Sequence, residues 1–309
     1  MRAGIFFIIV VCFAPAVSAD RGWSVGPLTV RNLASVPTFK QSADLTYNPR
    51  VATNLSIGPS FSFSETVALS IGLGLSREWT RNDVQTSPNE VWLSDPTFGI
   101  GYPLYGDSDA PVTLSGSTTV HVPLSPTSRA ASTITRIDQS ITASTRLSKL
   151  ALSYTTRGSK LFHEYTTGQL EAPRLGACLG VECFRFMHTG VRNTSWSNSH
   201  IVSVSYAPFS RLRLSALGGV GLSYLYPLTD VEGLPEDEGP AFRYATLTQL
   251  SAQVEVVSGC SLRAGVENFY AQLRPDGVQQ TFFFNRYANV FLDLVVSESL
   301  FTTASKGQK

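Results

Sequence analysis

The chain is short of charge. Lys, Arg, Asp and Glu make up only 15% of its 309 residues, whereas soluble domains usually contain about 25%. The formal net charge is +1, so the sequence lacks the basic surplus that binds nucleic acid, and we expect no nucleic-acid partner. The 4 histidines are scattered without a recognised ligand spacing. We therefore expect no metal site and no cofactor.

Long hydrophobic runs are missing after the N-terminus. Met1–Ala19 (MRAGIFFIIVVCFAPAVSA) has Arg2, an apolar centre and a small-residue end, which is typical of a secretory signal peptide. Its apolar run is too short to span a bilayer, which takes ~20 residues. The later segment Val290–Val296 is short and contains Asp293. Because only helices and closed barrels satisfy their backbone inside lipid, the exported chain is either soluble or a β-barrel.

Helical periodicity is scarce as well, whereas two-residue alternation is frequent. In Thr66–Trp79 (TVALSIGLGLSREW), large apolar residues alternate with small or polar ones. Alternate side chains of a strand point to opposite faces, so one face of this strand is a hydrocarbon stripe. Similar stripes recur in eleven segments from Val51 to Val296. The pattern predicts an all-β fold whose apolar stripes face either lipid or a protein core.

The connections between these segments alternate in length. Short joints lie near Ser62–Glu65, Gly106–Pro111, Ser148–Lys149, Pro208–Ser210 and Ser258–Cys260, and longer ones near Thr80–Glu90, Ser125–Ser132, Glu164–Thr194, Thr229–Pro240 and Arg274–Gln279. Short turns at one end and long loops at the other are typical of an outer-membrane barrel. A β-sandwich or β-helix could show the alternation but would not need this asymmetry. We therefore predict a transmembrane, up-and-down, antiparallel β-barrel whose stripes face lipid.

The strand count follows from the topology. Such barrels have an even number of strands, and Trp23–Val36 is the only candidate for a strand before the eleven segments. Gly26 and Pro27 make it a ragged edge. We predict twelve strands, with ten or fourteen as alternatives because Gln169–Ser195 could hide or extend a hairpin. The domain boundaries are then a signal peptide at 1–19, the barrel at 20–296 and a polar C-terminal tail at 297–309.

The residues between the apolar stripes would face the barrel interior. The charged and ionisable residues at these positions are Asp95, His121, Arg136, Asp138, Arg146, Arg157, Arg243, Glu255, Arg263, Glu267 and Asp293. They could line a polar conduit and select what passes. They could equally pair across the lumen and fill a narrow barrel. The sequence leaves both alternatives open.

The mature chain resembles the Gram-negative outer-membrane β-barrels along its whole length. LSDPTFGIGYPLY (Leu93–Tyr105) is also similar to a Gly/Asp-rich strand of barrels that take up fatty acids and aromatic compounds. The resemblance implies the outer membrane as the location, its lipid as the surroundings, and a non-enzymatic channel or transporter for small solutes. The alternative is a structural or surface-interaction barrel that anchors an envelope complex and contacts an envelope protein through Glu164–Thr194. Unlike such barrels, which commonly end on an aromatic residue, this chain continues to Lys309.

An enzymatic role is the weaker alternative. Outer-membrane phospholipases have twelve strands and a Ser-His-Asn arrangement, and here His188, Asn193 and Ser195 cluster in MHTGVRNTSWSNSH. That family places its serine two residues after the histidine, where this chain has Gly190. A nucleophile needs a base within hydrogen-bond reach and a group that orients the base. Since the motif fails at its nucleophile, we expect no hydrolase activity.

The cysteines predict one disulfide. Signal cleavage removes Cys12 and leaves Cys178 and Cys183 in the longest loop and Cys260 in a short turn. In the up-and-down order, these two sites lie at opposite ends of a hydrocarbon core ~30 Å thick, whereas a disulfide requires Cα atoms within ~7 Å. We therefore predict a disulfide between Cys178 and Cys183 and a free Cys260.

Overall fold

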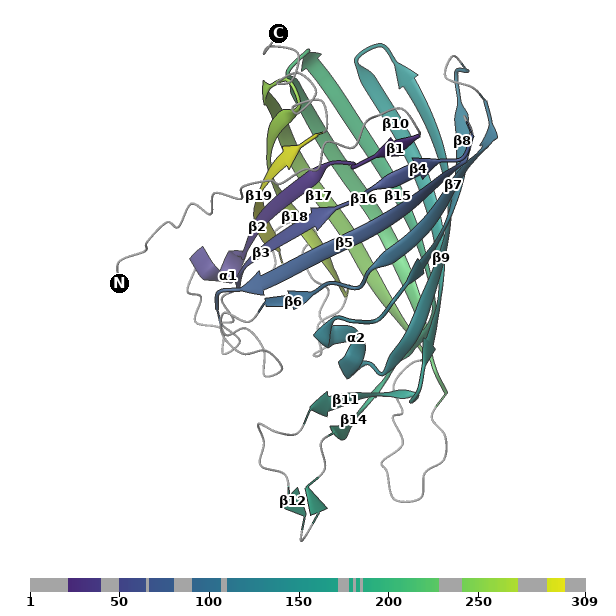
Figure 1. The fold of residues 1–309 in the computed structure, drawn as a ribbon, viewed down its shortest axis with the longest axis vertical. Helices are drawn as coiled ribbons and strands as arrows, with labels where there is room; N and C mark the ends of the chain where they lie inside the picture. The colour runs from purple at the N-terminus through teal and green to yellow at the C-terminus, as the bar shows by residue number, and fades with distance from the viewer. Residues whose placement is uncertain are drawn as a thin grey trace.

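The computed structural model describes residues 22–39, 50–64, 67–80, 91–106, 110–171, 178–179, 182–183, 186–227, 241–271 and 288–297. Twelve of its strands form one closed antiparallel ring in chain order, and β19 closes the ring by pairing with β2 (Figure 1). These strands are β2 (Leu28–Ser35), β3 (Val51–Ile57), β5 (Ala68–Glu78), β7 (Thr97–Tyr105), β8 (Thr113–His121), β9 (Thr133–Leu147), β10 (Leu150–His163), β15 (Thr194–Phe209), β16 (Leu212–Leu225), β17 (Phe242–Val257), β18 (Cys260–Ala271) and β19 (Asn289–Val296). The predicted twelve-stranded barrel is confirmed.

The shorter elements lie around the ring. They are β1 (Trp23–Ser24), β4 (Ser60–Ser62), β6 (Val91–Leu93), β11 (Thr167–Glu171), β12 (Cys178–Leu179), β13 (Glu182–Cys183), β14 (Phe186–Arg192), α1 (Val36–Phe39) and α2 (Pro126–Ala130). Strands β11 and β14 form a separate two-stranded sheet beyond the ends of β10 and β15. The region in which a further barrel hairpin could have hidden thus extends one connection without changing the strand count. Neither helix in the described ranges is long or apolar enough to cross a membrane.

The first strand is broken at its predicted ragged edge. Trp23–Val36 is not one strand, because β1 pairs with β4, β2 pairs with β3, and Val36 begins α1. Gly26 has φ +69°, which favours glycine, and Pro27 has no N–H to donate to a ladder. A Cβ atom on Gly26 would overlap the carbonyl oxygen of Gly58. The chain therefore breaks here so that two irregular segments can lie side by side.

The proposed ends of the mature chain remain predictions. Residues 1–21 and 298–309 lie outside the described residues, and so do the signal peptide and most of the polar tail. Strand β19 ends at Val296.

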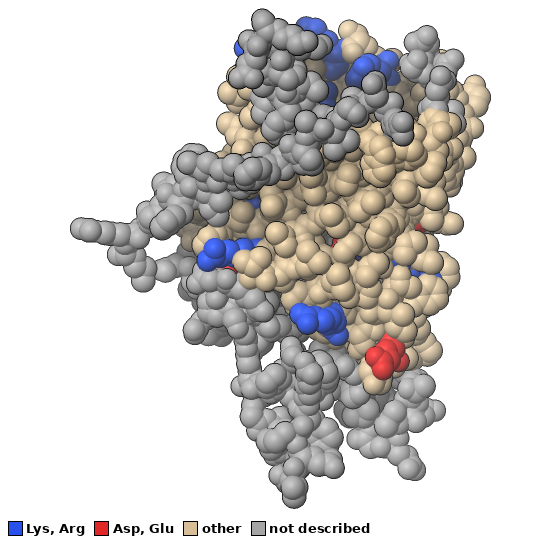
Figure 2. Space-filling model, in the orientation of Figure 1, with Lys and Arg blue, Asp and Glu red and all other residues tan. Residues whose placement is uncertain are grey.

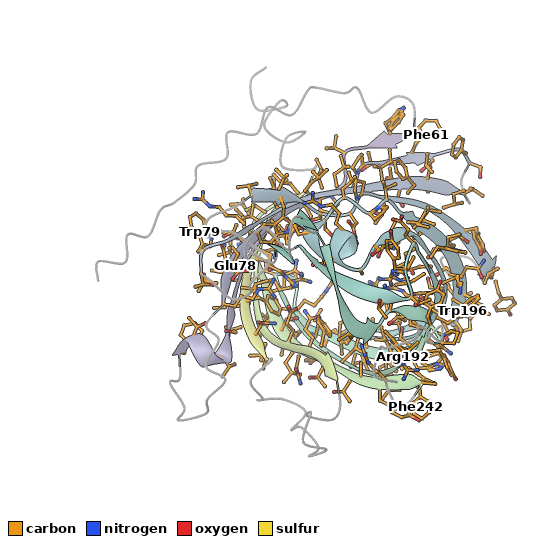
Figure 3. All side chains as sticks on the ribbon, turned by 90° about the horizontal axis from the view of Figure 1, so that it is seen from below. Phe61, Glu78, Trp79, Arg192, Trp196 and Phe242 are labelled. Carbon is orange, nitrogen blue, oxygen red and sulfur yellow. The ribbon has the colours of Figure 1, made fainter. Side chains whose placement is uncertain are left out.

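The apolar stripes form the exposed face of the barrel. On β5, Leu73 and Leu75 are 43% and 41% exposed, whereas Ser76 and Glu78 on the other face are 7% and 2% exposed. Figure 3 shows Trp196 and Phe242 pointing away from the ring of strands. The barrel wall visible in Figure 2 is almost free of charged side chains. An exposed apolar surface of this extent is typical of contact with lipid, as the alternation in Thr66–Trp79 predicted.

Candidate functional site: the inner face and one mouth of the barrel

The inner face carries an ion-paired cluster on three adjacent strands. Asp293 on β19 is fully buried and lies opposite Arg263 on β18 and Arg31 on β2. Arg31 Nε donates to Asp293 Oδ1 at 2.9 Å, and Arg263 Nη2 donates to Asp293 Oδ2 at 2.5 Å. Arg31 Nη1 also donates to Glu267 Oε2 at 3.0 Å. Two arginines and two carboxylates thus balance in charge, and both guanidinium groups lie over the Phe291 ring.

A second cluster occupies the opposite wall. On β9, Asp138 is 6% exposed, and its two carboxylate oxygens accept hydrogen bonds from Arg136 Nε and Nη2 at 2.6 and 2.9 Å. His121 Nε2 on β8 lies 3.0 Å from Asp138 Oδ2, and Arg136 Nη2 also reaches Ser159 Oγ on β10 at 3.3 Å. The carboxylate is therefore buried, and its charge is balanced by Arg136.

The segment that carries α2 is tied to the barrel by Asp95. Ser125 caps α2, with its side chain accepting a hydrogen bond from Ser128 N, and Pro126 follows at the first helical position, a usual helix-start sequence. Asp95, between β6 and β7, accepts hydrogen bonds from Leu124 N at 2.8 Å, Ser125 N at 2.6 Å and the Ser128 hydroxyl. Burial disfavours the charged carboxylate, but the hydrogen bonds from Ser128 and Ser125 outweigh burial, so the pKa of Asp95 lies below its usual range.

The same segment is held from the other side by β10 and the residues before β15. Asn193 Nδ2 donates to Ala131 O at 2.8 Å and to Tyr165 O at 2.9 Å. His163 Nδ1 lies 2.7 Å from the same Ala131 oxygen. Since both sides of the segment are hydrogen-bonded to the barrel, α2 occupies a fixed position at this mouth.

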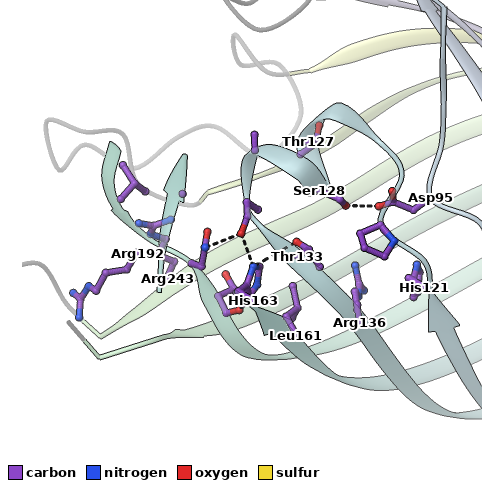
Figure 4. Close-up of a pocket in the computed structure, with 17 residues that line it drawn as sticks. Asp95, His121, Thr127, Ser128, Thr133, Arg136, Leu161, His163, Arg192 and Arg243 are labelled. Atoms are coloured by element: carbon purple, nitrogen blue, oxygen red, sulfur yellow. Dashed lines mark hydrogen bonds between the residues drawn. The ribbon is translucent and has the colours of Figure 1, made fainter. Parts of the chain in front are cut away.

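Between α2 and the barrel wall is a cavity of about 490 Å³ (Figure 4). Its lining combines the Asp95 tether, His121 and Arg136 of the second cluster, His163, and Arg243 from β17. Arg243 is exposed, and the described residues give it no ion pair. The cavity thus presents a cation at the mouth, next to polar and small apolar groups.

Arginines are the exposed charged residues of the described inner-face strands. They are Arg146 on β9, Arg157 on β10, Arg213 on β16 and Arg243. Within the described residues, these four have no salt bridge, whereas Asp138, Glu267 and Asp293 are buried and paired. Glu255 is half-buried and lines a second cavity with Arg211 and Arg213 near the short turns. The accessible charge of the inner face is therefore positive.

The inner-face residues predicted from the sequence fall into four groups. His121, Arg136 and Asp138 are brought together, as are Arg263, Glu267 and Asp293. Asp95 tethers α2, and Arg146, Arg157, Arg243 and Glu255 stand apart from both clusters.

Two arginines were missed in the sequence. Arg31 was missed because faces were assigned only from Val51 onward, and Arg31 lies on the strand before it. Arg213 could have been found, because it alternates with Leu212 and Leu214.

Two residues of the hydrolase-like motif have structural partners, and the side chain of His188 lies outside the described part of the structure. Asn193 holds α2, and Ser195 Oγ accepts a hydrogen bond from Lys160 Nζ at 2.8 Å. Among the described residues, no group of three or more His, Cys, Asp and Glu side chains could hold a metal ion.

The backbone places the two predicted disulfide partners opposite each other. Cys178 on β12 lies directly opposite Cys183 on β13, a spacing at which Cα atoms are close enough for a disulfide. Their side chains lie outside the described part of the structure, so the bridge stays a prediction. Cys260 is free.

The Asp95 tether gives a testable pH dependence. Because its folded pKa is lowered, the stabilisation is present above the unfolded pKa of about 4 and is lost as the pH falls through the folded pKa. We expect Asp95→Ala at pH 7 to lower hydrogen-exchange protection of the Leu124 and Ser125 amides by at least about tenfold, because the lost charge-assisted bonds contribute ~1.5–3 kcal/mol each. Wild-type protein should lose the same protection only in acid, and unchanged protection in Asp95→Ala would contradict the tether.

Comparison with a solved outer-membrane channel supports the fold. No family model matches the chain, and no curated protein matches its sequence. Among solved structures, an outer-membrane channel from Pseudomonas putida F1 is similar at TM-score 0.54 and 11% identity, covering 92% of this chain and 98% of that one. The NanC porin is similar at TM-score 0.46 and 12% identity, covering 87% and 98%, and the KdgM porin at 0.42 and 8%, covering 88% and 98%.

The closed twelve-stranded ring, its apolar exposed face and its charged inner face define the class: this chain has the fold of an outer-membrane β-barrel. The outer membrane is therefore its location. Within that class, the solved structures it resembles include channels and porins.

Proposed function

We propose that the barrel is a non-enzymatic channel for small solutes with a preference for anions. The observation that carries the proposal is the charge pattern of the inner face, on which arginines are exposed while the carboxylates are buried or half-buried. Rings and rows of arginine favour anions in pores. An arginine in water stays charged at every physiological pH.

The positions of the arginines support a path along the whole barrel. Arg157 lies in the middle of β10, opposite Ser140 and Ser199. Arg146 and Arg213 lie close to the short turns, and Arg243 lines the cavity at the other mouth. An anion that enters beside Arg243 would thus meet further positive side chains before it leaves.

The experiment is ion selectivity in planar bilayers. In a KCl gradient, we expect the current through the wild-type barrel to have a reversal potential of the sign that anion selectivity produces. Arg146→Ala combined with Arg157→Ala should lower the anion-to-cation permeability ratio a few-fold, because two unit charges ~4 Å apart in water interact by ~1 kcal/mol. Arg136 is unsuitable for this test, since its removal would leave Asp138 without its arginine.

Arg77→Ala is the matched control. Arg77 also carries one positive charge, but its guanidinium stacks on the Trp79 ring at 3.9 Å, on the exposed face of β5, so its loss should leave the reversal potential unchanged. The absence of any current from folded wild-type protein would contradict a channel. If the double substitution leaves the reversal potential unchanged, the proposed role of the arginines is wrong.

A further inference from the structure

The exposed face of the barrel carries uncharged polar side chains amid the apolar stripes. Asn32 and Thr53 satisfy each other, since Thr53 Oγ1 donates to Asn32 Oδ1 at 2.7 Å, whereas a larger group lies on β8, β9, β10 and β15. We call it the outer polar patch; it consists of Thr118, Gln139, Thr156, Asn198 and His200. Strand register makes it continuous: Gln139 lies opposite Thr118 on one side and Gly158 on the other, Gly158 lies opposite Asn198, and Thr156 lies opposite His200. The patch therefore spans four neighbouring strands, β8, β9, β10 and β15.

The patch lies at the depth of the hydrocarbon. On β15, Trp196 and Tyr206 are exposed on the same face as Asn198 and His200. Ten residues of strand span ~33 Å, which at a tilt of ~40° gives a height of ~25 Å, the usual height of the apolar band. Asn198 and His200 lie between these two aromatic residues. On the next strand, the corresponding positions are Leu222 and Val220, so the patch ends at β15 on this side.

Lipid cannot satisfy these side chains. His200 Nδ1 pairs with the Tyr154 hydroxyl at 2.7 Å. Gln139 and Asn198 are exposed, and within the described part of the chain their amides have no hydrogen-bond partner. Each unsatisfied polar group in hydrocarbon is costly, because acyl chains neither donate nor accept hydrogen bonds. The two amides therefore require a partner that brings polar groups to this depth.

The patch also contains a notch. Gly158 has no side chain, and a cavity of about 550 Å³ opens at this point of the wall. Its lining is Thr156, Gly158, Trp196, Ser197, Asn198 and Tyr224. A Cβ atom on Gly158 would meet nothing within 4 Å, so the barrel's own packing does not require glycine here. Small residues at such places allow close approach of another membrane protein.

We propose that the outer polar patch is the interface with a second copy of this chain. Amide side chains both donate and accept hydrogen bonds, so the patch can complement itself about a twofold axis. Its five residues carry no fixed charge. Lys160, two positions after Gly158 on the same face of β10, directs its Nζ to Ser195 Oγ at 2.8 Å. A second copy of the barrel also lies at the same depth in the membrane, because it has the same apolar band, and it presents the same amides. This inference is independent of what the barrel transports.

The test is the mass of the protein in density-matched detergent, measured by analytical ultracentrifugation. We expect wild-type protein to sediment as a dimer, and Gly158→Trp to sediment as a monomer because the indole fills the notch. Gln139→Leu with Asn198→Leu should also give monomers. The matched control is Leu292→Trp on β19, which is 51% exposed on the apolar face and lies nearly across the ring from β10; it should keep the wild-type mass.

Folding of each variant is checked by gel electrophoresis, in which the folded barrel of an unheated sample migrates differently from the unfolded chain of a boiled sample. Folded Gly158→Trp with the wild-type oligomer mass would contradict the location of the interface. Wild-type protein that stays monomeric at every concentration would overturn the proposal. A mass that exceeds the monomer by bound lipid or lipopolysaccharide, rather than by a second chain, would overturn the choice of partner.

Discussion

Asp293→Ala is expected to destabilise the barrel by about 3–5 kcal/mol, the usual cost of removing one partner from a buried ion pair. Asp293 is 0% exposed and is the acceptor for both Arg31 and Arg263. Its loss leaves two guanidinium groups beside one carboxylate, Glu267, which Arg31 alone contacts among the described residues. Urea unfolding in lipid vesicles, followed by tryptophan fluorescence, measures the change.

A second substitution separates charge imbalance from lost packing. Arg263→Ala added to Asp293→Ala restores the balance between Arg31 and Glu267, so the double variant should be more stable than the sum of the two single variants implies. Asp293→Asn keeps the shape and isolates the effect of charge. If the two single costs simply add, the cluster does not behave as one electrostatic unit and the expectation is wrong.

The barrel could be predicted because its physical signal is repeated in every strand. Each strand has to present apolar residues to lipid at every second position, so the stripe in Thr66–Trp79 and its counterparts defined both faces. The alternation of short and long connections then gave the topology. The sequence also indicated where a local constraint opposes the alternation, at Gly26 and Pro27, and the backbone interrupts the first strand there.

The composition of the inner face was predictable, but its pairing was not. The sequence placed Asp138, Glu267 and Asp293 on the correct face, but which arginine meets which carboxylate depends on register between strands far apart in sequence. Arg31 lies 262 residues from Asp293 and still forms its closest contact across the β2–β19 seam. The role of Asp95 was equally hidden, because it requires the position of α2. The exposure of each arginine side chain distinguishes the arginines without a salt bridge from the paired ones. It depends on how the closed ring packs, so the sequence alone does not give it.

The residues of the outer polar patch stand in the sequence, but their grouping does not. Asn198 and His200 occupy the same alternating positions as Trp196 and Val202, and a single polar residue in a stripe carries little information. Only the register showed that Gln139 and Asn198 flank Gly158 on adjacent strands. A patch is a property of several strands together, so it could not be read from any one of them.

Leu250→Arg is expected to destabilise the barrel by about 2–4 kcal/mol, the cost of an arginine at the bilayer midplane on the lipid face. Leu250 is 48% exposed near the middle of β17, which runs from Phe242 to Val257. The same urea titration in vesicles gives the value. Val256→Arg, on the same face near the strand end, should cost only ~0–1 kcal/mol, since the penalty falls toward the interface. Gln249→Arg, on the opposite face and opposite Glu267, should also be mild. Equal losses for Leu250→Arg and Gln249→Arg would show that the two faces of β17 meet the same surroundings, and the assignment of the apolar face to lipid would then be wrong.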